Sequence, residues 1–118
     1  MRIAEHATGS SVAEGDWADQ TRRVLTRDLL LRAHHAHPAE SQALQFRALH
    51  LNLPLVREIA DGLGLDEADR AAVEHDALDG LVQALGAFDA YGDQHFADFA
   101  APFVEREIRR SLQILGRV

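Results

Sequence analysis

Histidines and carboxylates are the side chains of this chain best suited to chemistry. His34, His35 and His37 fall close together just before Pro38, a density that invites interpretation as a metal site. His34 and His35 are adjacent, however, and neighbours on a helix cannot point the same way. The group is better explained as the cationic end of a helix, where it complements the helix dipole. We therefore expect no metal site.

Catalytic motifs are missing from the sequence. It contains no His-Glu-x-x-His, no phosphate-binding glycine loop and no Gly-x-Ser-x-Gly. It also has no cysteine, and so no thiolate nucleophile or cysteine-ligated zinc. The acidic residues cluster in helical patterns that do not order them as cation ligands. We expect a binding protein that uses no cofactor, and not an enzyme.

Charge is the most informative feature of the composition. Nineteen acids oppose twelve basic residues, all arginine, for a net charge of −7. Residues 64–105 hold ten acids and one base, a net charge of −9, whereas residues 1–63 sum to −1 and residues 106–118 to +3. Proteins bind nucleic acid by neutralising phosphates with Lys or Arg, so a surface this acidic repels the polyanion. The charge favours protein partners and predicts weak or absent DNA binding.

Apolar periodicity predicts an all-α fold, a compact bundle of about four helices. Two stretches, residues 73–88 and 96–115, carry apolar residues mostly at three and four residue spacing, which places them in one stripe per helix. The first stripe is Val73, Leu78, Leu81, Val82, Leu85 and Phe88, and the second is Phe96, Phe99, Phe103, Val104, Ile108, Leu112 and Leu115. A short bend joins the stretches, so the two stripes are most simply buried against each other.

The first third of the chain divides into a tail and a helix. Residues 1–16 lack apolar periodicity and are rich in Ala, Ser, Gly and Glu, so we expect a mobile tail followed by one helical domain over residues 17–118. A helical pattern then starts at Asp19. Its interleaved arginines are Arg22, Arg23, Arg27 and Arg32. They are expected to form a solvated face, the alternative being an arginine patch for nucleic acid.

A proline shapes the next helix. Pro38 suits its first turn, where a missing N–H costs nothing. Pro54 lies inside the same pattern and predicts a kink near Leu51, because proline removes a backbone hydrogen bond. Asn52 and His50 stand beside the kink, where we expect them to cap the freed backbone groups.

Local signals also place the last two helices. Asp66 followed by Asp69 predicts an N-cap that starts a helix running to Phe88. In the final helix we expect ion pairs one turn apart, such as Glu105 with Arg109.

A further set of residues follows a family pattern in order and without a gap. These residues are Gly80, Leu81, Ala84, Phe88, Asp89, Phe96, Phe99, Ala100, Pro102, Glu107, Ile108 and Arg110, preceded by Asn52-Leu53-Pro54-Leu55-Val56-Arg57 and Ile59-Ala60. The pattern resembles region 2 of the bacterial sigma-70 factors, especially the group that works with anti-sigma partners in stress response and sporulation. The likeness covers roughly residues 44–112.

The resemblance implies two working surfaces. In the family, the helix corresponding to residues 66–88 docks on the RNA polymerase clamp through polar and acidic groups. The matching candidates here are Glu74, His75, Asp76, Asp79 and Gln83. The candidates for facing promoter DNA are Tyr91, Phe99, Arg106, Arg109 and Arg110. The phenylalanines at three and four residue spacing are interpreted first as a core stripe and only second as a platform for bases.

Departures from the pattern concentrate where the family grips its partners. Ala72 and His75 replace the Asp and Gln of the family's clamp-gripping turn. Gly92 and His95 stand where arginines are common, and Asp98 replaces a threonine. These changes predict weakened DNA reading.

The sequence therefore predicts a sigma-70 region-2-like protein in transcription control that acts mainly through proteins. The expected partner is RNA polymerase core or an anti-sigma-type regulator, with self-association possible. The alternative is a functional sigma fragment that binds polymerase and the promoter minus-ten element. No apolar run approaches the ~18 residues that cross a bilayer, and the first residues lack the apolar stretch of a secretory signal, so we expect a cytoplasmic location and no membrane contact.

Overall fold

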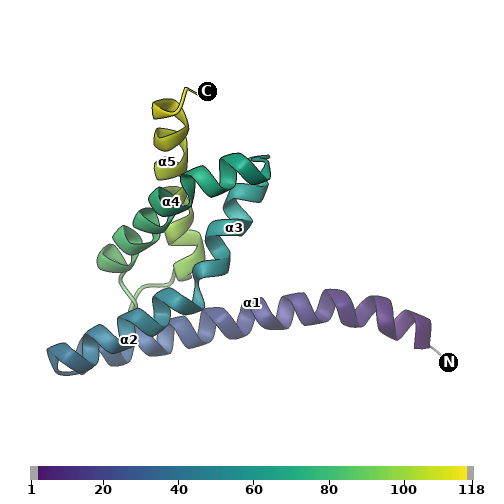
Figure 1. Ribbon diagram of the computed structural model, residues 1–118. Helices are drawn as coiled ribbons and strands as arrows, with labels where there is room; N and C mark the ends of the chain where they lie inside the picture. The colour runs from purple at the N-terminus through teal and green to yellow at the C-terminus, as the bar shows by residue number, and fades with distance from the viewer. Residues whose placement is uncertain (1–2, 117–118) are drawn as a thin grey trace.

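Five helices follow one another in the described part of the chain (Figure 1). The structure, a computed structural model, describes the backbone of residues 3–116 and the side chains of residues 17–116. The helices are α1 (Ile3–His35), α2 (Pro38–Leu51), α3 (Leu53–Gly62), α4 (Glu67–Ala87) and α5 (Phe96–Ile114). No strand occurs within residues 3–116, so the predicted all-α bundle is confirmed. The count exceeds four because the predicted kinked helix is divided into α2 and α3.

Helices α4 and α5 make the most extensive contact between helices, as the two apolar stripes predict. Gly80 lies where they cross. A Cβ added there would lie 2.7 Å from the carbonyl oxygen of Phe103 and 2.9 Å from Cα of Val104. Only glycine lets the two backbones approach this closely. Leu81, Val104 and Ile108 are fully buried beside this crossing.

Small residues occupy much of the α4–α5 seam, and this corrects the predicted stripes. Val82 is 48% exposed and Leu115 is 45% exposed, so both lie outside the interior. Ala77, Ala84 and Ala100 are completely buried instead. Large apolar side chains dominate a hydrophobicity pattern, whereas closely packed helices need small residues where they touch.

The aromatic residues close the end of the helix pair near the α4–α5 loop. The ring centroids of Phe88 and Phe96 are 5.3 Å apart, those of Phe88 and Phe99 are 5.4 Å apart, and those of Phe99 and Phe103 are 5.1 Å apart. Phe96 is buried, and the other three pack partly buried against the core. The preferred interpretation of these rings as a core stripe is confirmed.

The predicted kink occurs at Asn52, the single residue between α2 and α3. Asn52 is 1% exposed, and its Nδ2 donates to the carbonyl of Ala48 at 2.8 Å and to Oγ1 of Thr26 at 2.9 Å. The Asn52 side chain thus binds the last turn of α2 and ties the kink to α1, although it makes no capping hydrogen bond to α3. Pro54 falls in the first turn of α3, where it costs no hydrogen bond. Helix α2 runs along α1, and α3 turns away from them (Figure 1).

Helix α1 begins at Ile3, before the expected start of the ordered domain at Trp17. Its backbone therefore crosses much of the segment 1–16 that was predicted to be a mobile tail. The side chains of that segment lie outside the described residues, and its mobility stays a prediction.

Two of the four predicted arginines of α1 hold other elements, so the prediction of a solvated face is wrong for Arg22 and Arg27. The Arg27 guanidinium donates to the carbonyl oxygens of Ala90, Gly92 and Gln94, each at 2.6 Å. The Arg22 side chain is 12% exposed and pairs with Glu58 of α3 at 3.3 Å. Helix α1 thus fixes the α4–α5 loop through one arginine and α3 through another.

Candidate protein-binding surfaces

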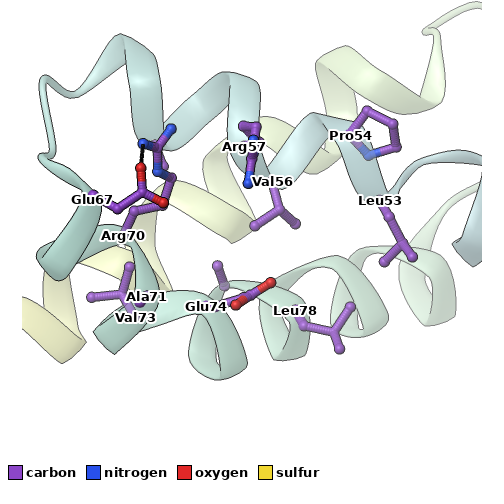
Figure 2. Close-up of a pocket in the computed structure, with 12 residues that line it drawn as sticks. Leu53, Pro54, Val56, Arg57, Glu67, Arg70, Ala71, Val73, Glu74 and Leu78 are labelled. Carbon is purple, nitrogen blue, oxygen red and sulfur yellow. Dashed lines mark hydrogen bonds and ion pairs between the residues drawn. The ribbon is translucent and has the colours of Figure 1, made fainter.

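A groove of about 540 Å³ runs between α3 and α4. Figure 2 shows the residues that line it, with apolar side chains from both helices. Leu53, Pro54 and Val56 line it from α3, and Val73 and Leu78 from α4. An apolar floor of this kind suits side chains from another protein.

Local sequence signals determine where α3 ends and where α4 begins. Gly64 adopts a positive φ of 76° after α3, the usual way for a helix to end at glycine. The Asp66 carboxylate then accepts from the amide of Asp69 at 2.8 Å, which confirms the predicted N-cap of α4. Arg70 bridges the helices by pairing with Asp61, and it also pairs with Glu67 at 3.2 Å.

Helix α4 divides the predicted clamp-binding residues between two surfaces. Glu74 lines the α3–α4 groove, near Arg57 in Figure 2. His75, Asp76, Asp79 and Gln83 do not line it. His75 is 86% exposed at its side chain, and its Nε2 lies 3.9 Å from the Asp79 carboxylate one turn on. We call the surface of α4 formed by Asp76, Asp79, Val82 and Gln83 the acidic ridge.

The predicted DNA-facing arginines of α5 are engaged with their own helix. Arg106 lies over the ring of Phe103, 5.2 Å from its centroid. Arg109 pairs with Glu105 at 3.7 Å, as predicted, and Arg110 pairs with Glu107 at 2.9 Å.

The two predicted DNA-facing aromatics are also in contact with other side chains. Tyr91 is 59% exposed, its hydroxyl hydrogen-bonds to Nε2 of His35, and its ring packs edge-on against His34 at 5.3 Å. Phe99 belongs to the aromatic cluster. The histidines at the end of α1 thus hold the tyrosine of the α4–α5 loop.

Comparison with known proteins finds no match. No family model, no curated protein and no solved structure matches this chain. The resemblance to sigma factors therefore depends on its own residues and their spacing. Within the described residues, no helix is both long enough and apolar enough to span a membrane.

Sequence reasoning missed a second groove, which lies between α1 and α2. It has a volume of about 550 Å³. Its lining residues are Leu25, Asp28, Leu29, Arg32, Phe46, Arg47, His50 and Leu51. Phe46, one of the lining residues, is 59% exposed. Its position beside Arg47, off the stripe of Leu44 and Ala48, was the available signal.

Two arginines stand out because their side chains have no polar or ring partner among the described residues. Six other arginines pair with carboxylates, Arg27 binds backbone carbonyls and Arg106 lies over Phe103, whereas Arg47 and Arg57 have no such contact. Arg47 lines the α1–α2 groove and Arg57 lines the α3–α4 groove. Each groove thus offers one cation that is free to meet an acidic partner.

Proposed function

We propose that this chain is a protein-binding module of transcription control. Its frame is that of a sigma-70 region 2, and its partner is RNA polymerase core or a sigma or anti-sigma regulator. The supporting observation concerns two sets of residues. Several residues shared with the family pack in the core of the fold. The residues on which DNA recognition would depend are missing or already contact other side chains.

Several of the residues shared with the family pack in the interior of the fold. Gly80 and Leu81 form the α4–α5 crossing. Phe88, Phe96 and Phe99 form the aromatic cluster at the end of the pair. A likeness that includes such positions supports a common frame, because these are the places where packing dictates the residue type.

The surfaces of α4 and α5 favour proteins over phosphates. Arg109 and Arg110 already neutralise carboxylates of their own helix, so a DNA phosphate would have to displace Glu105 and Glu107. Residues 64–105, which include α4 and the following loop, carry a net charge of −9. The acidic ridge suits a basic surface on a protein partner, where complementary charge speeds association and fixes orientation.

Binding to purified bacterial core RNA polymerase and to forked promoter DNA tests this function. We expect the chain to bind core polymerase, and reversing two charges with Asp76→Arg and Asp79→Arg to weaken that binding about tenfold or more. Glu40→Arg is the matched control, since Glu40 is an exposed acid on α2, away from the ridge. Biolayer interferometry measures the three affinities.

Binding to labelled forked promoter DNA at low salt is the second measurement. We expect that adding the protein causes no measurable change in the fluorescence anisotropy of the DNA. Tight binding that weakens steeply as salt rises would identify a functional sigma fragment and overturn the loss of DNA reading. If the chain binds neither core polymerase nor any sigma or anti-sigma factor of its host, the assignment to transcription control fails.

A further inference from the structure

The α1–α2 groove exposes apolar surface that nothing in the described chain covers. Val24 is 68% exposed, Phe46 is 59% exposed and Leu25 is 45% exposed, and the last two line the groove itself. The Phe46 ring stacks on His50, with 4.5 Å between ring centroids. Leu25 and Phe46 line one groove from neighbouring helices, which makes them more than the isolated exposed residues of an ordinary surface.

The rim of this groove carries a net positive charge, because Arg32 and Arg47 line it against the single acid Asp28. Arg47 has no carboxylate partner among the described residues, and Arg32 is 54% exposed despite its contact with Asp28 at 3.5 Å. His50 also lines the groove, beside the two arginines. An apolar floor with a basic rim fits an amphipathic helix that carries acids beside an apolar residue.

Helix α4 is such a helix. Asp76, Asp79 and Val82 follow one another at three-residue spacing and therefore form one ridge on the helix surface. Val82 is 48% exposed, and no packing within the chain accounts for it. Asp76 forms no ion pair among the described residues, and Asp79 meets only His75, at 3.9 Å.

A chain cannot place its own acidic ridge in its own groove. The end of α4 meets the α1–α2 hairpin through a different set of residues, including Leu30, Ala33 and Gln45, around a separate cavity that Leu85 also lines. The groove residues Leu25 and Phe46 do not line that cavity. The acidic ridge and the α1–α2 groove can therefore meet only when they belong to two different molecules.

We propose that the acidic ridge of one copy docks in the α1–α2 groove of a second copy. Val82 lies among Leu25 and Phe46 of the second copy, and the two aspartates face Arg32 and Arg47. The contact joins two different surfaces, so it is heterologous and extends head to tail. The inference does not depend on the proposed function.

Charge reversal on each side of the contact tests the proposal by sedimentation velocity from low to high micromolar protein. Wild-type chain is expected to form assemblies that grow with concentration. Arg47→Glu and Asp79→Arg are each expected to weaken the association about tenfold or more, because like charges then face each other.

Mixing the two variants gives the decisive result. The intact ridge of the Arg47→Glu chain fits the intact groove of the Asp79→Arg chain, and the altered groove and altered ridge carry opposite charges, so the mixture is expected to regain assemblies that grow with concentration. A symmetric interface predicts instead a mixture that stops at two chains. Circular dichroism confirms that both variants are folded.

Arg57→Glu is the matched control. It changes the net charge as much as Arg47→Glu does, and Arg57 is also unpaired, but it lies in the α3–α4 groove. Assembly should match that of the wild type. A monomeric wild-type chain at every concentration would overturn the proposal, as would equal loss of assembly in the Arg47 and Arg57 variants.

Discussion

Two glycines of α4 have different effects on the stability of the fold. A side chain at Gly80 would collide with the backbone of α5, whereas a Cβ at Gly86 would meet nothing within 4 Å. Gly80 is therefore required by packing. Gly86 carries the entropic cost of glycine in a helix without a compensating contact.

Alanine at each position separates these two roles. We expect Gly80→Ala to lower the free energy of unfolding by about 1–3 kcal/mol, because the backbones must move apart. Gly86→Ala should raise it by about 0.5–1 kcal/mol, the difference in helix propensity. Urea denaturation measures both. Equal effects in the two variants would show that the α4–α5 crossing is looser than described.

At the scale of elements, Arg27 provides most of the polar contact between α1 and the α4–α5 loop. Its guanidinium reaches three carbonyl oxygens of the α4–α5 loop, more than sixty residues along the chain. The loop contains two acids, and its only other polar tie to α1 among the described residues is the Tyr91–His35 hydrogen bond. A single side chain thus sets how firmly the loop is held.

Replacing Arg27 with lysine should release the loop. Lysine lacks the planar fork of donors, so it cannot satisfy three carbonyls at once. We expect a loss of about 1–3 kcal/mol in stability and faster hydrogen exchange at the amides of residues 89–95. Arg23→Lys is the control, because Arg23 meets only Asp19 on the same helix, at 3.8 Å. Unchanged exchange in the loop of the Arg27 variant would contradict the role given to this arginine.

The elements also show what the sequence alone could predict. Pro38, the Asp66 cap and the kink beside Pro54 are local signals, and the structure confirms all three. The exposure of Val82 was not predictable in this way, because a helix stripe says which residues are apolar but not which of them a neighbour covers. The hydrogen-bond partners of Arg27 could not be predicted for a similar reason, because contacts between distant segments produce no periodic pattern in the sequence.

The candidate site was predicted only in part. Glu74 and Asp79 were grouped because the corresponding helix of the resembled family docks through polar and acidic residues, yet one lines a groove and the other lies on the acidic ridge. The α1–α2 groove needed two helices to be placed side by side before its lining could be seen. Sequence reasoning found the acidic helix and missed the basic groove that complements it.

At the scale of the whole molecule, charge is unevenly distributed. Residues 64–105 carry a net charge of −9, whereas Arg32 and Arg47 line the α1–α2 groove together with His50 and Asp28. If the acidic ridge serves both a transcription partner and a second copy of the chain, the two associations compete. Each open head-to-tail assembly leaves one ridge free, however many copies it contains.

This competition predicts a link between assembly size and partner binding. The apparent affinity of wild-type chain for core polymerase, per mole of chain, should fall with concentration by a factor equal to the mean number of chains per assembly. The Arg47→Glu variant keeps its ridge and cannot assemble, so its affinity should stay constant and exceed that of the wild type at high concentration. Titration of labelled core polymerase, with sedimentation at the same concentrations, gives both quantities. If assembly occurs while wild type and variant bind polymerase equally, polymerase uses a different surface, such as the α3–α4 groove around Arg57.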